Sequence, residues 1–143
     1  MNTPAALILA IAATLLPCLA HAQTPIPADR AMVAIVGDAE LFNVGQDGYC
    51  GERTTINSPS KTKFLIPAGQ RSWFFLSSKL HVPVATLTCS GDYSFVPVAG
   101  KLHIFRYSFV GENCLLEHFS GDPGKTPEPT ELQPEKRRSC LVQ

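Results

Sequence analysis

The chain has 143 residues, and its 12 Lys and Arg residues balance 12 Asp and Glu residues, so the formal net charge is zero. This length accommodates one domain of ordinary size, and a hydrophobic content of 45% with 17% charged residues argues against a disordered protein. The balanced charge argues against nucleic acid or acidic membrane surfaces as partners, because both require an excess of basic residues.

The first 22 residues have the pattern of a secretory signal peptide. Residues 5–16 are apolar except for one Thr, and Pro17 ends the run before Ala20-His21-Ala22. As a helix this run spans about 18 Å, against ~30 Å for the hydrocarbon core of a bilayer, which favours a cleaved signal over a membrane-spanning segment. We expect cleavage after Ala22 and no transmembrane segment in the mature chain. The alternative is a lipid anchor at Cys18, where the preceding proline fits a lipoprotein signal poorly.

Four cysteines remain in the predicted mature chain, namely Cys50, Cys89, Cys114 and Cys140. An even number in a small exported chain predicts two disulfides formed in an oxidising compartment. A zinc site with four thiolates is the alternative, but zinc ribbons take ligands in close pairs and this chain has no close pair. Three disulfide connectivities are possible, and we favour Cys50–Cys89 with Cys114–Cys140.

The rest of the chain is typical of short β-strands. Runs of β-branched and aromatic residues alternate with Gly, Pro, Asn and Asp, without a helical stripe of useful length. Because Pro83 cannot donate a hydrogen bond, the run that contains it is expected at a sheet edge or at a strand start. The pattern predicts an all-β fold over residues 23–120, either a small antiparallel β-sandwich or a partly open barrel, stapled by two disulfides. The expected strands are residues 31–36, 40–44, 53–57, 62–66, 71–76, 81–88, 93–96, 101–110 and 113–119.

Two segments of the chain echo each other. Residues 64–76 and 95–107 align with Phe, Ala, Gly and a second Phe at common positions. We interpret both as hairpins built from a strand, a Pro/Gly turn and a return strand. An internal duplication is the alternative interpretation.

Residues 121–143 differ in character from the rest of the chain. Residues 121–134 hold four of the 12 prolines and almost no apolar residue, so this segment is expected to be extended and loose. If Cys140 is paired, the Pro-rich, charged tail is tethered across the domain. The basic triplet at residues 136–138 follows three Glu residues, which favours a solvated, self-compensating segment over an anion site.

Three short motifs follow one another along the chain, namely Gln46-Asp47-Gly48, residues 64–71 (Phe-Leu-Ile-Pro-Ala-Gly-Gln-Arg) and residues 93–101 (Tyr-Ser-Phe-Val-Pro-Val-Ala-Gly-Lys). They resemble those of PEGA-like β-sandwich modules of bacterial envelope proteins. The resemblance covers roughly residues 33–109 and implies a non-catalytic structural or interaction module. It transfers no functional residue, because the shared positions are turn and core positions, and the four cysteines depart from it.

The sequence contains no recognisable constellation for catalysis, cofactor binding or metal binding. Isolated surface positions explain His81, His103 and His118 more simply than a metal site does. Ser58 and Lys61 match Ser-x-x-Lys by coincidence, since the partner motifs and the Gly-x-Ser-x-Gly elbow are absent. Glu112 and Glu117 have an odd separation on one expected strand, which places them on opposite faces.

The sequence therefore predicts a non-catalytic, exported binding or structural module of the bacterial periplasm or cell surface. Its expected partner is an envelope protein or a glycan, and Trp73, Phe74 and Tyr93 are the candidate contact residues. The first alternative is a secreted or periplasmic inhibitor or immunity protein that brings the loop at residues 45–53 to an enzyme. The second alternative is a small hydrolase.

Overall fold

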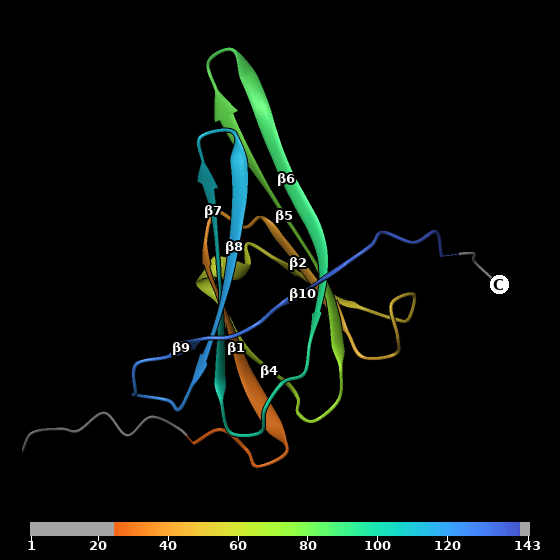
Figure 1. Cartoon of the computed structure of the whole chain (residues 1–143), viewed down its shortest axis with the longest axis vertical. Coiled ribbons are helices and arrows are strands. Elements are labelled where there is room, and N and C mark those ends of the chain that lie inside the picture. Colours follow the sequence, from red (N-terminus) through yellow and green to blue (C-terminus); the bar gives the residue numbers. More distant parts are fainter. Residues whose placement is uncertain (1–24, 141–143) are drawn as a thin grey trace, which may run out of the picture.

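The structure is a computed structural model that describes residues 25–140, so the predicted signal peptide, Cys18 and the cleavage position lie outside the described residues. These residues form two five-stranded sheets packed face to face (Figure 1). Among them, no helix has the length and apolar character to cross a membrane.

Each sheet takes strands from distant parts of the chain. The first, sheet A, has the order β4 (Lys63–Pro67), β1 (Arg30–Gly37), β7 (Leu102–Val110), β8 (Asn113–Gly121) and β9 (Glu128–Pro129). The second, sheet B, has the order β10 (Gln133–Glu135), β6 (Ala85–Phe95), β5 (Ser72–Val82), β2 (Leu41–Gly45) and β3 (Thr54–Asn57).

The predicted all-β fold with two disulfides is confirmed, and it is a two-layer sandwich. The pairing is not wholly antiparallel, however. Strand β1 runs parallel to β7 with Val33 opposite His103, while the other described pairs are antiparallel.

Alternation along the strands places large apolar side chains between the sheets. Phe42, Phe74 and Phe105 are fully buried, and their rings meet with centroids 5.0 Å apart for Phe42–Phe74 and 4.8 Å apart for Phe74–Phe105. Burying one such side chain stabilises the fold by about 1.5–3 kcal/mol. The core is therefore an aromatic cluster supplied by both sheets.

The two echoing segments are not hairpins, contrary to our interpretation. One connects β4 of sheet A to β5 of sheet B, and the other connects β6 of sheet B to β7 of sheet A. Both turns contain a glycine with positive φ, Gly69 at 81° and Gly100 at 72°. The Gly69 N–H donates to the Pro97 carbonyl over 2.8 Å, so the two crossings lie side by side.

The prediction of one strand at residues 81–88 is wrong. Pro83 and Val84 form the turn of a long hairpin, in which β5 and β6 pair from Ser72↔Phe95 to Val82↔Ala85. A turn is a position where the missing N–H of proline costs no ladder bond. Because β2 pairs with β5 only as far as Ser77, the hairpin projects beyond the rest of the sheet (Figure 1).

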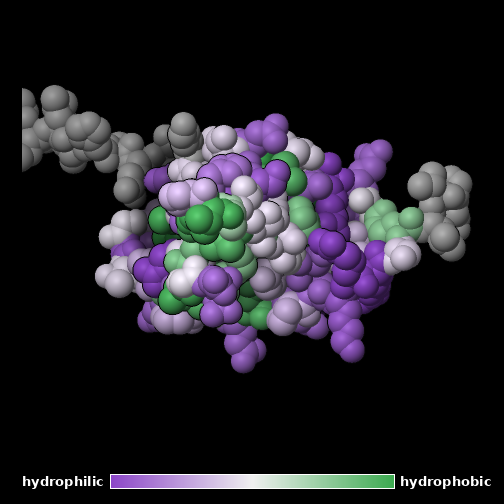
Figure 2. Space-filling model, turned by 90° about the horizontal axis from the view of Figure 1, so that it is seen from above, coloured by the Kyte–Doolittle hydropathy of each residue, from purple (hydrophilic) through white to green (hydrophobic). Residues whose placement is uncertain are grey.

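The projecting end carries exposed apolar side chains. A view from above shows hydrophobic residues gathered there, with hydrophilic residues toward the side where the chain ends (Figure 2). Leu80 (37%) and Val84 (94%) belong to this hairpin, and Val110 (57%) and Leu115 (44%) belong to the β7–β8 hairpin.

Both disulfides have a connectivity that differs from the one we favoured. Cys50 pairs with Cys140 over a sequence separation of 90, and Cys89 pairs with Cys114 over a separation of 25. Cys89 lies on β6 and Cys114 on β8, so this bond ties sheet B to sheet A. The strand order decides which cysteines meet, and the cysteine spacing alone does not reveal it. The two disulfides indicate an oxidising, exported compartment.

The tail is not loose, which corrects the expectation drawn from its prolines. Its residues form β9 beside β8 and β10 beside β6, so it completes one edge of each sheet. Between these strands the chain crosses from sheet A to sheet B at residues 130–132, which we call the crossing segment. The tail is finally tethered through Cys140 to Cys50.

Candidate functional site

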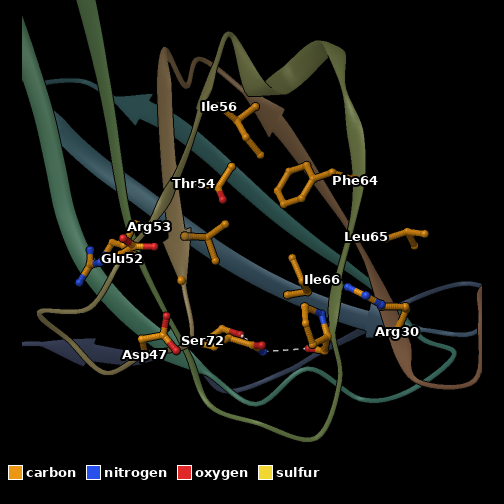
Figure 3. A pocket seen from close by; sticks show the side chains of 14 residues that line it. Arg30, Asp47, Glu52, Arg53, Thr54, Ile56, Phe64, Leu65, Ile66 and Ser72 are labelled. Atoms are coloured by element: carbon orange, nitrogen blue, oxygen red, sulfur yellow. Dashed lines mark hydrogen bonds between the residues drawn. The ribbon is translucent and has the colours of Figure 1, made fainter.

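The sandwich has two sides at which edge strands of the two sheets face each other. On one side the crossing segment joins β9 to β10. On the other side β3 and β4 are joined by a short 3-10 turn, η1 (Pro59–Lys61). This second side contains a cleft of about 540 Å³, which we call the β3/β4 cleft (Figure 3).

The inner wall of the β3/β4 cleft is formed by apolar side chains. In β4 the alternation turns Phe64 and Ile66 toward the interior while Leu65 points outward with 45% of its surface exposed. Ile56 of β3 faces them from the other sheet, and the three side chains converge in Figure 3. Val44 of β2 lies behind them in the core. The cleft is therefore a continuation of the hydrophobic core that opens to solvent.

One polar side chain spans the end of the cleft away from η1. Gln46 follows β2, and its Nε2 donates hydrogen bonds to the Pro67 carbonyl and to Ser72 Oγ, each over 2.9 Å (Figure 3). These bonds join the end of β2 in sheet B to the end of β4 in sheet A. The cleft is thus bounded by η1 at one end and by Gln46 at the other.

The rim of the cleft carries charges of both signs. Arg30 of β1 lies on the sheet A side, with its Nε 3.6 Å from Asp29. Asp47 and Glu52 come from the loop between β2 and β3 and are exposed. Arg53 also contributes to the rim, and its guanidinium reaches Asp92 over 3.6 Å. A ligand in the cleft would therefore meet acidic groups on one side and a basic group on the other.

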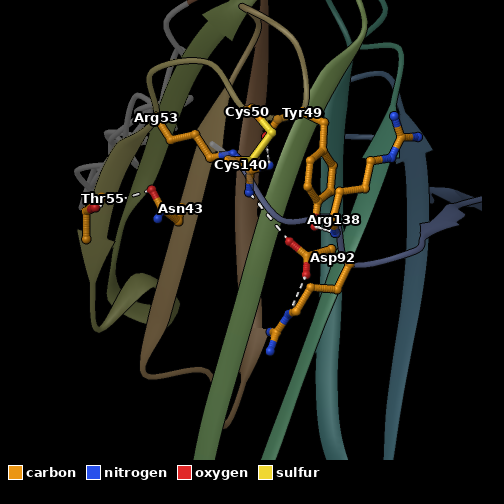
Figure 4. Close-up of polar contacts among 9 residues, drawn as sticks. Asn43, Tyr49, Cys50, Arg53, Thr55, Asp92, Arg138 and Cys140 are labelled. Atoms are coloured by element: carbon orange, nitrogen blue, oxygen red, sulfur yellow. Dashed lines mark hydrogen bonds and ion pairs between the residues drawn. A yellow bond between two sulfur atoms is a disulfide. The ribbon is translucent and has the colours of Figure 1, made fainter. Parts of the chain in front are cut away.

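The loop that forms this rim is fixed by the tail. Its Cys50 forms a disulfide with Cys140, and the Tyr49 hydroxyl accepts a hydrogen bond from the Arg138 backbone N–H over 3.2 Å (Figure 4). The Asp92 carboxylate also pairs with Arg137 over 3.4 Å. Because Asp92 is nine-tenths buried, these charge pairs are shielded from solvent more than surface pairs are.

Backbone groups along the cleft are available as well as side chains. In the described part of the chain, β3 and β4 are the outermost strands of their sheets. An edge strand presents alternate N–H and C=O groups without ladder partners, and such groups can pair with an added strand. The cleft therefore combines hydrogen-bonding edges with an apolar interior.

The predicted contact residues lie elsewhere. Phe74 is fully buried and belongs to the core, so it is not a contact residue. Tyr93 is half-buried and stacks on Phe74 with ring centroids 5.5 Å apart, and burial together with Asp92 raises the pKa of its hydroxyl. Trp73 is half-buried on β5. None of the three lines the β3/β4 cleft.

Two of the three histidines are not isolated surface residues, contrary to expectation. His103 of β7 and His118 of β8 are 1% and 5% exposed, and His103 Nδ1 lies 3.0 Å from His118 Nε2. Their spacing of 15 residues gave no signal, because the register of β7 with β8 brings them together. His81 is exposed, and over residues 25–140 no group of three or more His, Cys, Asp or Glu residues is arranged to hold a metal ion.

Fold and cleft together define a disulfide-locked β-sandwich with one open edge. Comparison of the chain with protein-family models, curated proteins and solved structures gives no significant match. The resemblance to PEGA-like modules therefore stays a prediction from the sequence.

Proposed function

We propose that this chain is a non-catalytic binding module of the bacterial periplasm or cell surface, and that its ligand is an extended segment of another envelope protein. The observation that carries the proposal is the β3/β4 cleft, where two free strand edges border a cavity of about 540 Å³ with apolar side chains on its inner wall. The resemblance to PEGA-like modules agrees with a non-catalytic role.

An extended segment fits this cleft better than a compact ligand does. Strand β4 has five residues, or about 17 Å, along which a partner strand would form main-chain hydrogen bonds. Every second side chain of the partner would then enter the cleft against Phe64, Ile66 and Ile56. Each large apolar side chain buried there would contribute about 1.5–3 kcal/mol before the cost of ordering the segment.

The charged rim of the cleft would favour one orientation of the bound segment. Arg30 lies opposite Pro67 and Asp47 follows Gln46, so these charges gather at the Gln46 end of the cleft, on opposite walls. A segment with alternating apolar residues and charged residues near one end would place that end there. Such rim charges affect specificity and the rate of association more than the affinity itself.

The test is selection of peptides from a random display library on the oxidised protein, followed by affinity measurement on two variants. Ile56→Glu places a charge inside the cleft and is expected to weaken binding by at least about tenfold, because burying an unpaired carboxylate is unfavourable. Val36→Glu is the matched control, since Val36 is 48% exposed on β1 and does not line the cleft. Equal effects of the two substitutions, or selection of glycans instead of peptides in a parallel array, would contradict the proposal.

An inhibitor that presents the loop at residues 45–53 is the second candidate. It is supported by the anchoring of that loop through the Cys50–Cys140 disulfide and the Arg53–Asp92 ion pair, since a rigid loop loses little entropy on binding. Pull-down from envelope extract separates the two candidates. An inhibitor recovers an enzyme, and Gly48→Trp at the tip of the loop abolishes recovery while Ile56→Glu does not.

A further inference from the structure

The buried pair His103 and His118 lies between the core and the tail. His118 stacks on Phe105 with ring centroids 4.6 Å apart, and Phe95 packs against both imidazoles. The backbone of the crossing segment lies against the pair, because Glu131 contributes its carbonyl to His118. The pair therefore contacts the tail directly.

The hydrogen bonds of the pair determine which nitrogen of each imidazole carries a proton. The Val98 N–H donates to His103 Nε2 over 3.0 Å, so that nitrogen carries no proton. The proton of neutral His103 is then on Nδ1, which donates to His118 Nε2 over 3.0 Å. His118 in turn carries its proton on Nδ1 and donates to the Glu131 carbonyl over 3.3 Å. Both imidazoles are neutral in this arrangement, and both have the Nδ1–H tautomer.

This arrangement leaves neither imidazole with a free ring nitrogen for an additional proton. Each Nε2 already accepts a hydrogen bond, so a proton added to His103 would face the Val98 N–H, and one added to His118 would face the N–H of His103. Either event breaks a bond of the chain that ends at Glu131. Burial and the neighbouring His118 accordingly lower the pKa of His103 to about 4, and burial lowers the pKa of His118.

The contacts of the crossing segment are few. The Thr130 N–H donates to the His118 carbonyl over 2.8 Å, and Leu132 packs against the core. On either side, β9 has two residues and β10 has three. A cavity of about 560 Å³ lies beside the segment, lined by Phe95 and His118 among others. The segment can therefore open without separating the larger strands.

We propose that residues 130–132 form a proton-gated strap. While both histidines are neutral, the relay from Val98 to Glu131 holds the strap closed between the sheets. A protonated imidazole at either position is a buried charge without a counter-charge, and opening of the strap brings water to His118. Protonation of the pair therefore favours the open strap. The Cys50–Cys140 disulfide keeps the released tail attached, so that closure is reversible.

Other charged groups do not substitute for the pair. Arg71 and Glu131 are the ionisable residues that line the cavity beside the imidazoles. Arg71 is engaged by Ser94 and Gln133, each over 2.9 Å, and Glu135 is bound to Ser94 over 2.6 Å. From β1, Val33 faces His103 with an apolar side chain. No carboxylate among the described residues is hydrogen-bonded to either imidazole, so none stabilises the charged form.

Amide hydrogen exchange on the oxidised wild-type protein tests the strap. The proposal requires that water reaches both imidazoles in the open state, where His103 then regains its ordinary pKa. From a pKa of about 4 for His103 in the closed state, the open fraction then rises about 30-fold between pH 7.5 and pH 5. After correction for the intrinsic exchange rate, the protection of the Thr130 amide should fall by that factor or more. The Ile35 amide in the middle of sheet A should remain far better protected. Unchanged protection at Thr130, or equal protection of Thr130 and Ile35 at pH 5, would overturn the proposal.

Two further measurements assign the effect to the pair. His103→Gln removes one titrating group and is expected to abolish most of the 30-fold change, while His81→Gln, at an exposed histidine, should leave it intact. If the His103 variant does not fold, nitrogen NMR of the wild-type imidazoles gives the answer. At pH 6, His103 and His118 should be neutral with the proton on Nδ1, and a charged imidazole or the other tautomer at either position would overturn the relay.

Discussion

The two sides of the sandwich differ in how the gap between the sheets is covered. Each side presents a short edge strand from each sheet, β9 and β10 on one and β3 and β4 on the other. On the tail side, the crossing segment passes through the gap and adds Leu132 to the core. On the cleft side, η1 bridges the sheets at one end and Gln46 at the other, so the apolar interior between them reaches solvent.

The difference shows how a two-layer fold can close one side and leave the other side open. The tail side is held by a disulfide with a sequence separation of 90 residues and by a buried histidine pair. On the cleft side, η1 joins the sheets at one end and hydrogen bonds of Gln46 join them at the other, while the Cys50–Cys140 bond fixes the loop at the rim. On the cleft side, the unpaired edge groups of β3 and β4 border an interior that reaches solvent.

The largest expected effect comes from removing the Cys50–Cys140 disulfide. Replacement of Cys50 and Cys140 by Ser should lower the free energy of unfolding by about 4 kcal/mol, because the disulfide closes a long loop in the unfolded chain. Guanidinium denaturation measures the change. Removal of the Cys89–Cys114 bond, which closes a loop of 25 residues, serves as the comparison and should cost less through chain entropy. A negligible loss for the Cys50–Cys140 bond would mean that the tail is not part of the cooperative fold.

The second effect is loss of stability in acid. Because the pKa of His103 falls from about 6.5 to about 4 on folding, the unfolded chain binds more protons between these values. The stabilisation is therefore complete above pH 6.5 and decreases as the pH falls toward 4, by about 3 kcal/mol for this group. The lowered pKa of His118 adds a change of the same sign. Denaturation at pH 7.5, 5.5 and 4.5 tests this, with His81→Gln as the unaffected control.

A smaller effect is expected on the cleft side. Gln46→Ala removes the hydrogen bonds to Pro67 and Ser72 and should cost about 1 kcal/mol, the net value of an ordinary hydrogen bond or two. The same substitution should leave the pH dependence unchanged, since Gln46 contacts neither histidine. Urea denaturation at two pH values measures both quantities. A variant that lost the pH dependence would show that the two sides are coupled.

The smallest effect is expected on the outer face of sheet A, away from both sides. Arg106 and Glu117 form an exposed ion pair with an Nε–Oε2 distance of 2.7 Å, and their pairing lowers the pKa of the Glu117 carboxyl. Exposed pairs of this kind contribute little in water and less in salt. Thermal unfolding of Arg106→Gln should be close to wild type, and a large loss would show that this face is engaged by another surface.

Several parts of the fold were predictable because they depend on local sequence. The strand at residues 101–110 alternates clearly, and it corresponds to β7 within one residue. Pro83 was correctly identified as a residue that cannot donate to a strand ladder, but it lies in a turn and not at a sheet edge. A turn tolerates the missing N–H as well as a sheet edge does. The even number of cysteines predicted two disulfides, which the structure contains.

The candidate site was much less predictable. Ile56 and Phe64 lie on strands that the sequence predicted. Their position at the cleft depends on β3 and β4 being edge strands, which only the strand order decides. No local sequence pattern encodes that order. The selection of Phe74 as a contact residue failed for the same reason, because its neighbours Trp73 and Phe75 are equally aromatic and only the register decides which side faces the core.

The sequence by itself determined the class of this protein: short strands and an even number of cysteines lead to a cross-linked all-β domain. β propensity and turn chemistry act on residues close together, and the number of cysteines can be counted without knowledge of their pairing. Tertiary structure decided which cysteines meet, that the proline-rich tail completes both sheets, and that His103 and His118 share a chain of hydrogen bonds. The physical reason is that pairing across a sandwich joins positions far apart in the chain, and side chains reveal their partners only after the strands have been ordered.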